Sequence, residues 1–563
     1  MKFSEMLYKR PDINAFINEM NKLIERVKNA RSYEEQLLAH KEFTVLMDKL
    51  DTMGTIAHIR NTINTEDDFY DREKDFFDEN EPLIENTSAE FYRALVSSGY
   101  RKELEEKLGK LLFENAELML KAIDPAIIPE LQEENKLVSE YIKLIASAQL
   151  DFEGKKLNLS QLRLYMESPD RDIRKGAYKK RTEFFEENKD KLDDIYDKLV
   201  KVRTKMAKKL GFENFVELGY IRMGRNCYGP KEVAAFREQV KKYMVPLSQK
   251  LNEKQRERLG LKKLTFIDNL LYFKDGNPKP KGTPEEIFKA GKKMYDELSD
   301  ETSEFFRFML ENELFDCLSR KGKAAGGYMT YIPDYKSPFI FANFNGTSGD
   351  IDVLTHEAGH ALNGYLAKDI EIREYRTATM ETCEVHSMSM EFFTIPWMEL
   401  FFGNRTEEYK YMHLASAINF IPYGCAVDEF QHEVYMNPDI TPNERKELWK
   451  RMERKYQPDL DYEDDPFFGK GGRWQAQTHI YSSPFYYIDY CLAQTCALQF
   501  RNLMAEDYQA AWEKYLSFSR KAGTMTFTEL LRTSGLRSPM DEGCVKDVCK
   551  NSEKAIEQIK LIG

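Results

Sequence analysis

Two histidines and a glutamate, in the stretch His356-Glu357-Ala358-Gly359-His360, have the residue types and spacing of a metal-dependent hydrolytic site. Four residues are little more than one turn of an α-helix, so both imidazole rings project from one face and can bind one metal ion. Glu357 follows the first histidine and is placed to activate a water molecule on that ion. The alternative is a pair of structural histidines, because a five-residue pattern also arises by chance.

A third ligand is the decisive feature, because a catalytic zinc ion usually has three protein ligands and keeps one position open for water. Glu381, Glu384 and His386 are the candidates, in a segment (380–391) whose apolar positions have helical spacing. On a helix His386 points roughly 200° away from Glu384. These two side chains cannot easily bind the same ion, and the residues alone leave the choice among the three open.

The sequence around the histidine pair also predicts the elements that position it. Ser348 and Asp350 can cap a helix that continues through a largely apolar run beyond His360. Upstream, residues 322–332 and 338–346 are dense in β-branched and aromatic residues bounded by Gly and Pro, which predicts two short strands. The edge of such a strand can bind an extended peptide by main-chain hydrogen bonds. The alternative is an internal hairpin that touches no ligand.

The segment 326–391 resembles the core of the thimet-oligopeptidase family of zinc metallopeptidases, most closely oligoendopeptidase F and the bacterial PZ-peptidases. In that family a glutamate ligand follows the histidine pair by about two dozen residues. Glu384-Val-His-Ser stands here at the place of the family's Glu-x-x-Ser. The resemblance therefore implies that His356, His360 and Glu384 are the ligands of one Zn²⁺ per chain.

The same resemblance assigns further roles near the ion. Glu357 becomes the general base of peptide hydrolysis. Glu381 and Asp352 become candidates to accept the far N–H of a liganding imidazole, which would fix its tautomer. The alternative for both acids is an ordinary solvated helix charge.

A second chemically dense stretch, 473–490, carries one histidine and a group of tyrosines. Peptide hydrolysis passes through an oxyanion that needs hydrogen-bond donors in addition to a metal ion. Members of the family carry a histidine and clustered tyrosines opposite the zinc, and by position these are His479 and Tyr490, with Tyr487 and Tyr486 as further candidates. This sequence lacks the double glycine of thimet oligopeptidase at that place. Since the chain has 31 tyrosines, packing is the alternative role.

By resemblance the fold is mainly α: a two-part helical zincin of the gluzincin type, neurolysin-like, with a small β-sheet beside the histidine helix and a deep substrate channel. A composition shift near residue 220 predicts an N-terminal helical domain, 1–220, and a catalytic domain, 221–563, whose last helices pack back onto the first part. Apolar positions at helical spacing predict long helices at 13–30, 90–112, 134–147 and 170–209.

Whole-chain properties restrict the function class. The chain has 563 residues, and 83 basic against 95 acidic residues give a net charge of −12 without a basic patch, which argues against nucleic-acid binding. No apolar run is long enough to span a membrane and the first residues do not have the pattern of a signal peptide, so a cytoplasmic location is expected. The eight cysteines form no CxxC pair, so reduced thiols are expected. The oligomeric state stays open.

These observations predict a zinc-dependent endopeptidase that hydrolyses internal bonds of short oligopeptides. Its likeness to PZ-peptidases adds collagen-derived peptides as a substrate group. One alternative is a zinc carboxypeptidase or dipeptidase, which would need a group that captures a chain end. Another is a non-catalytic peptide-binding scaffold with structural zinc or none. Glu357 favours catalysis, because a purely structural site has no need of it.

Overall fold

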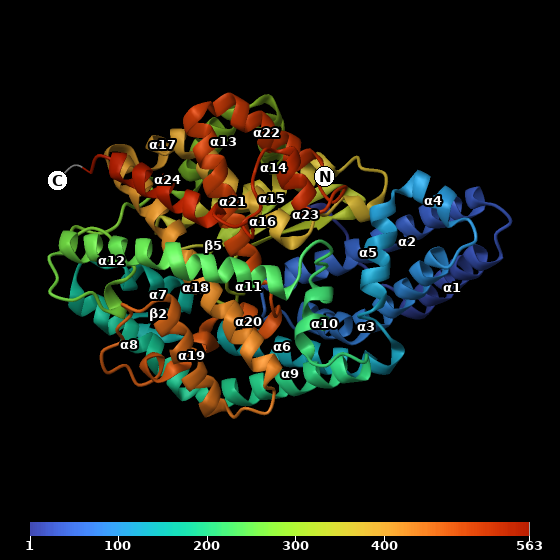
Figure 1. Ribbon diagram of the computed structural model, residues 1–563, viewed down its shortest axis with the longest axis horizontal. Coiled ribbons are helices and arrows are strands. Elements are labelled where there is room, and N and C mark those ends of the chain that lie inside the picture. The colour runs from blue at the N-terminus through green and yellow to red at the C-terminus, as the bar shows by residue number, and fades with distance from the viewer. Residues whose placement is uncertain (562–563) are drawn as a thin grey trace.

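The computed structural model describes residues 1–561, and helices make up most of it (Figure 1). The first helices of the chain, blue in Figure 1, form a group at one end of the molecule. They are α1 (Ile13–Asn29), α2 (Tyr33–Ile63), α3 (Asp68–Val96), α4 (Arg101–Leu108) and α5 (Lys110–Leu120).

The middle of the chain continues through helices and two short hairpin strands. These are α6 (Ile128–Ala146), β1 (Leu150–Phe152), β2 (Lys155–Leu157), α7 (Leu159–Met166), α8 (Arg171–Glu187), α9 (Lys189–Lys209), α10 (Phe215–Arg222), α11 (Pro230–Gln239), α12 (Val245–Leu259), α13 (Pro284–Leu298) and α14 (Asp300–Glu311).

The helices that follow the main sheet complete the chain. They are α15 (Gly349–Ala367), α16 (Met380–Phe393), α17 (Glu399–Phe402), α18 (Thr406–Met436), α19 (Pro442–Tyr456), α20 (Thr478–Ser482), α21 (Tyr487–Glu506), α22 (Tyr508–Arg520), α23 (Phe527–Thr533) and α24 (Cys544–Gln558). The predicted mainly α fold is confirmed. None of the helices within residues 1–561 is both long and apolar enough to cross a membrane.

Two hydrophobic cores hold these helices together. The smaller is built from α1–α5 through residues such as Met20, Phe43 and Phe113. The larger takes in the sheet and the helices from α6 to α24, and α2 reaches it through Ile56 and Ile59. The cores thus set the first five helices apart from the remainder, while the domain boundary near residue 220 stays a prediction.

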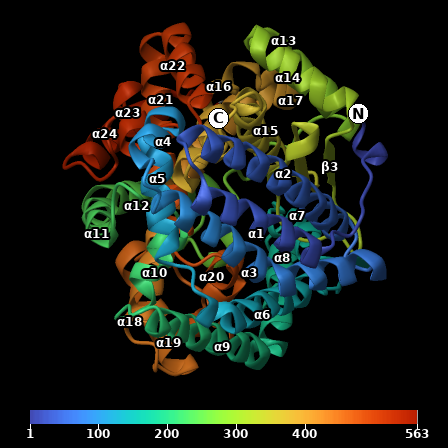
Figure 2. The ribbon, with the colours of Figure 1, turned by 90° about the vertical axis from the view of Figure 1, so that its right-hand side faces the viewer.

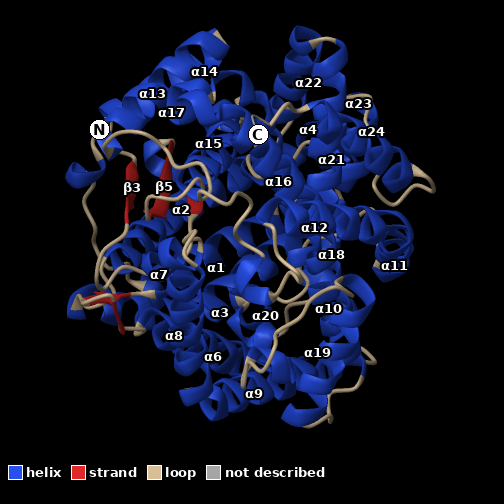
Figure 3. Cartoon of the chain, turned by 90° about the vertical axis from the view of Figure 1, so that its left-hand side faces the viewer, coloured by secondary structure: helices blue, strands red, loops and turns tan. Residues whose placement is uncertain are grey.

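The main sheet has three strands in the order β3-β5-β4, of which β3 and β5 are labelled in Figure 3. β3 (Phe315–Leu318) runs parallel to the central β5 (Ser337–Phe344), and β4 (Tyr328–Ile332) runs antiparallel to it. The two predicted strands correspond to β4 and β5, whereas β3 was not predicted. β4 lies at the edge of the sheet, and α2 packs against it. Figure 2 shows α2 on the side of the molecule formed by the first helices.

The predicted capping of the histidine helix is only partly right. Ser348 stands at the N-cap of α15, but its side chain makes no capping hydrogen bond. Asp350 instead accepts from the backbone N–H groups of Asn345 and Gly346, at 2.8 Å each. The carboxylate therefore fixes the turn that joins the end of β5 to α15, which sets the direction in which the helix leaves the sheet.

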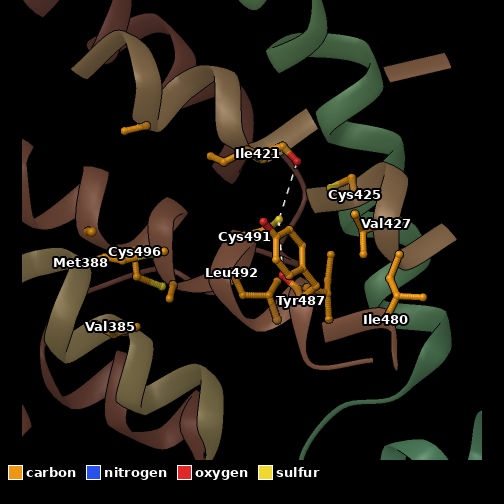
Figure 4. Packing of buried hydrophobic residues seen from close by; sticks show 14 of the residues in the cluster. Val385, Met388, Ile421, Cys425, Val427, Ile480, Tyr487, Cys491, Leu492 and Cys496 are labelled. Carbon is orange, nitrogen blue, oxygen red and sulfur yellow. Dashed lines mark hydrogen bonds between the residues drawn. The ribbon is translucent and has the colours of Figure 1, made fainter. Parts of the chain in front are cut away.

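Helices α15 and α16 pack unusually closely at Gly359. A Cβ atom at this position would lie 2.6 Å from the carbonyl oxygen of His386 and 2.7 Å from the Cα of Ser387, both backbone atoms of α16. Such distances are shorter than van der Waals contact, so only glycine fits here. On its other side α16 packs against α21, where Val385 and Met388 lie beside Cys496 (Figure 4).

Two of the long predicted helices are interrupted. The stretch 90–112 contains the end of α3, all of α4 and the start of α5, and Gly109, with a φ of 84°, separates the last two. The stretch 170–209 is divided at Asn188, whose side-chain amide donates to the carbonyl of Phe184 at 2.8 Å and ends α8. Local backbone and side-chain bonds of this kind override a helical apolar pattern.

His58, on α2, and Tyr328, on β4, lie close together. The ring of His58, on α2, is exposed to solvent, yet burial lowers its pKa to about 4, because protein surrounds it on most sides. Its centroid is 5.2 Å from that of the Tyr328 ring on β4. Glu85 on α3 is likewise exposed while burial raises its pKa to about 7. The deep substrate channel that the resemblance implies stays a prediction.

Replacing Gly359 with alanine is expected to push α15 and α16 apart. The clash is with backbone and cannot be relieved by a rotamer change, so we expect a loss of about 1–3 kcal/mol in the free energy of unfolding. Thermal and denaturant unfolding measure this. Gly364→Ala on the same helix is the matched control, because its Cβ would meet only the Tyr331 and Met329 side chains. Equal stability of Gly359→Ala and the native chain would contradict the packing argument.

Candidate metal centre and active site

The side chains of His356, His360 and Glu384 converge on one point between α15 and α16, which we call the metal point. Glu384 Oε2 lies 3.3 Å from His356 Nε2 and 3.4 Å from His360 Nε2. Zinc ligands about 2.0–2.1 Å from a tetrahedral ion stand roughly 3.3–3.4 Å apart. The donor set and spacing therefore fit a zinc ion. Glu384 is almost fully buried, whereas both imidazoles keep some exposure.

Further contacts hold the Glu384 carboxylate in place. The Ser387 hydroxyl, one turn along α16, donates to Oε2 at 3.0 Å. The hydroxyl of Tyr486 donates to the other oxygen, Oε1. Burial alone would raise the pKa of Glu384, but His360 and His356 outweigh it and hold the pKa well below its usual value. Glu384 therefore stays ionised, as a metal ligand must be.

Glu391 orients His356 from behind. Its Oε1 lies 2.7 Å from His356 Nδ1, and its Oε2 lies 2.8 Å from His413 Nε2 on α18. The bond to Nδ1 leaves His356 Nε2 directed at the metal point, which fixes the tautomer that a ligand needs. Burial raises the pKa of Glu391, but the two histidines more than compensate and hold it below its usual value.

The two acids that the sequence suggested for this role lie elsewhere. Glu381 accepts from the Thr379 hydroxyl at 2.9 Å, and burial raises its pKa. Asp352 accepts from the Tyr409 hydroxyl at 2.6 Å. Within residues 1–561 neither carboxylate bonds to His356 or His360, so Glu391 takes the place that was predicted for them.

Glu357 lies beside the metal point and beside the start of β4. It is buried, and its Oε2 has no hydrogen-bond partner within the described residues. A Cβ added to Gly327 would lie 3.4 Å from its Oε1, so the carboxylate adjoins the strand backbone. Burial raises the pKa of Glu357, because the charged form loses hydration. An unpartnered buried carboxylate at this place is available to exchange a proton with a substrate or water.

A chain of hydrogen bonds fixes the protonation of His479. The Tyr423 hydroxyl donates to Gln477 Oε1 at 2.9 Å, and the Gln477 amide N–H then bonds to His479 Nδ1 at 2.9 Å. Since Nδ1 accepts, neutral His479 carries its proton on Nε2, which lies 3.3 Å from the Tyr490 hydroxyl. Burial lowers the pKa of His479 to about 4, so the ring is neutral near pH 7.

The remaining candidates differ in their surroundings. Tyr486 contacts Glu384 directly, and its ring centroid is 4.9 Å from that of Tyr490. Tyr487 packs its ring against that of His479, with 5.2 Å between the centroids, and is almost buried. His386 points away from the metal point, against Phe518, and neither of its nitrogens has a partner within residues 1–561.

A cavity of about 560 Å³ opens next to these residues. Its wall includes Gly326 and Gly327 before β4, Val353 on α15 and Gln477, so it borders both Glu357 and the His479 chain. The opposite wall comes from α7 and α8, which precede the metal helices by more than a hundred residues in the sequence. The site therefore lies between distant segments of the chain.

Sequence reasoning missed Glu391, His413 and Gln477. Glu391 shares a helical face with Glu384, seven residues before it, and this spacing was the available signal. No sequence signal pointed to His413 or Gln477, because their partners lie on other elements of the fold.

Comparison with known proteins places the chain in a family. A profile of the Peptidase M3 N-terminal domain matches residues 3–123, and the profile of Peptidase family M3 matches residues 164–550. The chain belongs to Peptidase family M3, which confirms the resemblance, and it is a peptidase whose substrates are peptides. Comparison with curated protein sequences found no match.

Solved structures agree along the whole chain. A structure of PZ peptidase A with an inhibitor is 53% identical with a TM-score of 0.98, and the alignment covers 99% of this chain and 100% of that one. An X-ray structure described as oligoendopeptidase F is 51% identical with a TM-score of 0.98, covering 100% and 99%. A structure from Bacillus anthracis, also described as oligoendopeptidase F, is 47% identical with a TM-score of 0.93. The alignment covers 100% of this chain and 99% of that one.

If His356, His360 and Glu384 hold zinc, changing Glu391 to glutamine is expected to weaken zinc binding about 10–100-fold, the usual effect of losing the partner of a liganding histidine. Competition with a chromogenic chelator measures the affinity. Glu381→Gln is the matched control, because that acid lies on the same helix, is buried and contacts neither proposed histidine ligand. Equal affinities of the two variants would remove Glu391 from its orienting role.

Proposed function

We propose that this peptidase is a zinc-dependent endopeptidase that hydrolyses internal bonds of short oligopeptides, with one Zn²⁺ held by His356, His360 and Glu384. The observation that carries the proposal is the position of Glu357. It stands between a donor set with zinc spacing and the backbone at the start of an edge strand. An inert structural metal site has no use for a buried, unpartnered carboxylate at that place.

When bound, zinc would supply a Lewis acid that polarises the scissile carbonyl and lowers the pKa of water. Glu357 accepts the proton of the attacking water on its unpartnered carboxylate oxygen and then passes it to the leaving amine. Glu391 holds His356 in the tautomer that presents Nε2. Each of these roles belongs to a side chain whose place is set by α15 or α16.

Tyr490 donates a hydrogen bond to the developing oxyanion. Because the Nε2–H of His479 is directed at the Tyr490 oxygen, that oxygen acts as acceptor toward His479 and its own proton is free for the substrate. Tyr486 donates to Glu384 and steadies the ligand, while Tyr487 supports the His479 ring. His479 and Tyr490 thus act on the oxyanion as a pair.

The substrate is an extended peptide that adds to the edge of β4. Main-chain hydrogen bonds to a strand edge fix register with little dependence on side chains. The restriction to short peptides rests on the mainly helical bulk of the molecule and on the enclosed cleft that the family resemblance implies. Collagen-derived peptides, a cytoplasmic location and the absence of nucleic-acid partners stay predictions.

Zinc removal and a single substitution test the proposal. With a quenched-fluorescence peptide blocked at both ends, chelation is expected to abolish cleavage and added zinc to restore it. Glu357→Gln should keep zinc, because it is not a ligand, and lose at least ~100-fold in kcat. Turnover gives the rate and mass spectrometry of the metal-loaded protein gives the zinc content.

Two outcomes would contradict this assignment. Release of terminal residues only, from unblocked peptides, would favour the carboxypeptidase or dipeptidase alternative. Zinc binding without any cleavage would favour a peptide-binding scaffold.

Changing Gln477 to glutamate is expected to reverse the His479 tautomer. A carboxylate accepts from Nδ1–H, so the neutral ring exposes Nε2 as an acceptor and draws the Tyr490 proton away from the substrate. We expect kcat to fall roughly 10–100-fold at about pH 8, with little change in KM. Activity should recover as pH falls and His479 gains a proton, since Nε2 then donates again.

Nitrogen NMR of His479 together with the pH profile of kcat measures this effect. Tyr423→Phe is the control, because it loses only the bond that orients the Gln477 amide and creates no new titrating group. A Gln477→Glu enzyme with the native pH profile would exclude the tautomer from the mechanism.

A further inference from the structure

The cavity beside the metal centre contains a cation with no anionic partner. Three arginines line it: Arg163, Arg181 and Arg473. Arg163 pairs with Glu167 at 3.1 Å, and Arg473 lies 3.4 Å from Glu453. Within residues 1–561, the Arg181 side chain, on α8, is the one of the three without a carboxylate in ion-pair reach or a hydrogen bond of its own.

The surroundings of Arg181 are aromatic and positively charged. Its guanidinium carbon lies 4.5 Å from the centroid of the Phe468 ring and 5.5 Å from that of Phe185. Burial lowers its pKa, and the charge of Arg473 lowers it further. A half-buried cation in such a place is costly unless an anion joins it. Aromatic faces position the guanidinium but do not neutralise it.

The direction of β4 indicates which end of a bound peptide approaches this cation. Antiparallel addition is the slightly more stable mode of strand pairing, and a peptide added in that way to β4 runs from the Ile332 side toward Tyr328. Its C-terminal part then continues past Gly327, next to Glu357, and enters the cavity that Gly326 and Gly327 line. The residues that follow the cleaved bond therefore extend toward Arg181.

We propose that Arg181 binds the C-terminal carboxylate of the peptide substrate, so that the enzyme selects peptides by the distance between the cleaved bond and the free end. This inference rests on the proposed function, because it assumes that Glu357 marks the point of cleavage. The planar guanidinium can hold a carboxylate by two parallel hydrogen bonds. Arg181 is thus a specificity-determining residue, separate from the catalytic groups.

The test compares one quenched peptide as the free acid and as the C-terminal amide. We expect native enzyme to prefer the acid by about tenfold or more in kcat/KM, the size of a lost hydrogen bond to a charged group. Arg181→Gln should remove this preference while cleaving the amide as native enzyme does, and Arg181→Lys should keep part of it. Lys179→Gln, an exposed cation on the same helix, is the matched control.

A peptide series lengthened one residue at a time at its C-terminus extends the test. With the free acids, native enzyme should move its cleavage site along with the end, whereas Arg181→Gln should not. The melting temperature of Arg181→Gln should equal or exceed the native value, since a half-buried cation without an ion-pair partner is removed. A clear drop would indicate that Arg181 serves to support Phe468 and would overturn the inference.

Binding to metal-loaded Glu357→Gln protein separates failure of this inference from failure of the proposed function. Tighter binding of the acid than of the amide, lost in the Glu357→Gln/Arg181→Gln double variant, supports the inference even if no peptide is cleaved. Metal-dependent cleavage with equal use of acid and amide overturns it and leaves the proposed function intact. The last outcome concerns amidated peptides with and without an internal Glu. If the enzyme prefers those with the Glu, Arg181 recognises a side-chain carboxylate, and its assignment to the chain end is overturned.

Discussion

The close contact between α15 and α16 is the constraint on which the site depends. Gly359 lets the backbone of α16 approach where any side chain would collide with His386 and Ser387. Only at this separation does the Glu384 carboxylate come within 3.4 Å of both imidazoles. The glycine between the two histidines is therefore as necessary to the arrangement as the histidines, although it bears no functional group.

Charge balance explains the groups that surround this contact. Glu384 and Glu391 are ionised in a buried place, which is costly unless each carboxylate is paired and hydrogen-bonded. Without a metal, His356 compensates both acids, and its pKa is raised well above its usual value by Glu384 and Glu391 in spite of burial. A bound cation would displace that proton, and His413, whose pKa Glu391 raises, would remain to balance Glu391. One acid thus serves two histidines on different helices.

The sequence predicts those parts of the site that rest on local periodicity. The pairing of His356 with His360, the helix that carries Glu384 and the opposite direction of His386 all follow from the pitch of an α-helix, and the structure shows them. The choice of Glu384 over Glu381 needed the family resemblance, because both lie on the same helix. Gln477 and Arg181 could not be found in this way, since their significance depends on neighbours far away in the chain. The Asn188 break and the bonds of Asp350 to Asn345 and Gly346 show that side-chain contacts to backbone set where helices begin and end.

The parts of the active site also differ in how they are supported. The proposed metal ligands and the proposed oxyanion donor Tyr490 share one packed unit, because α16, which carries Glu384, lies against α21, which carries Tyr490. Figure 4 shows residues of both helices in contact. A displacement of either helix would disturb both functions together, so this unit has little freedom to vary. The cavity wall that carries Arg181 comes from α8, which packs chiefly against α7 and β1 and whose Phe185 lies against Phe467 and Phe468. Substitutions on α8 can therefore alter which peptides are bound without moving the groups that perform the chemistry.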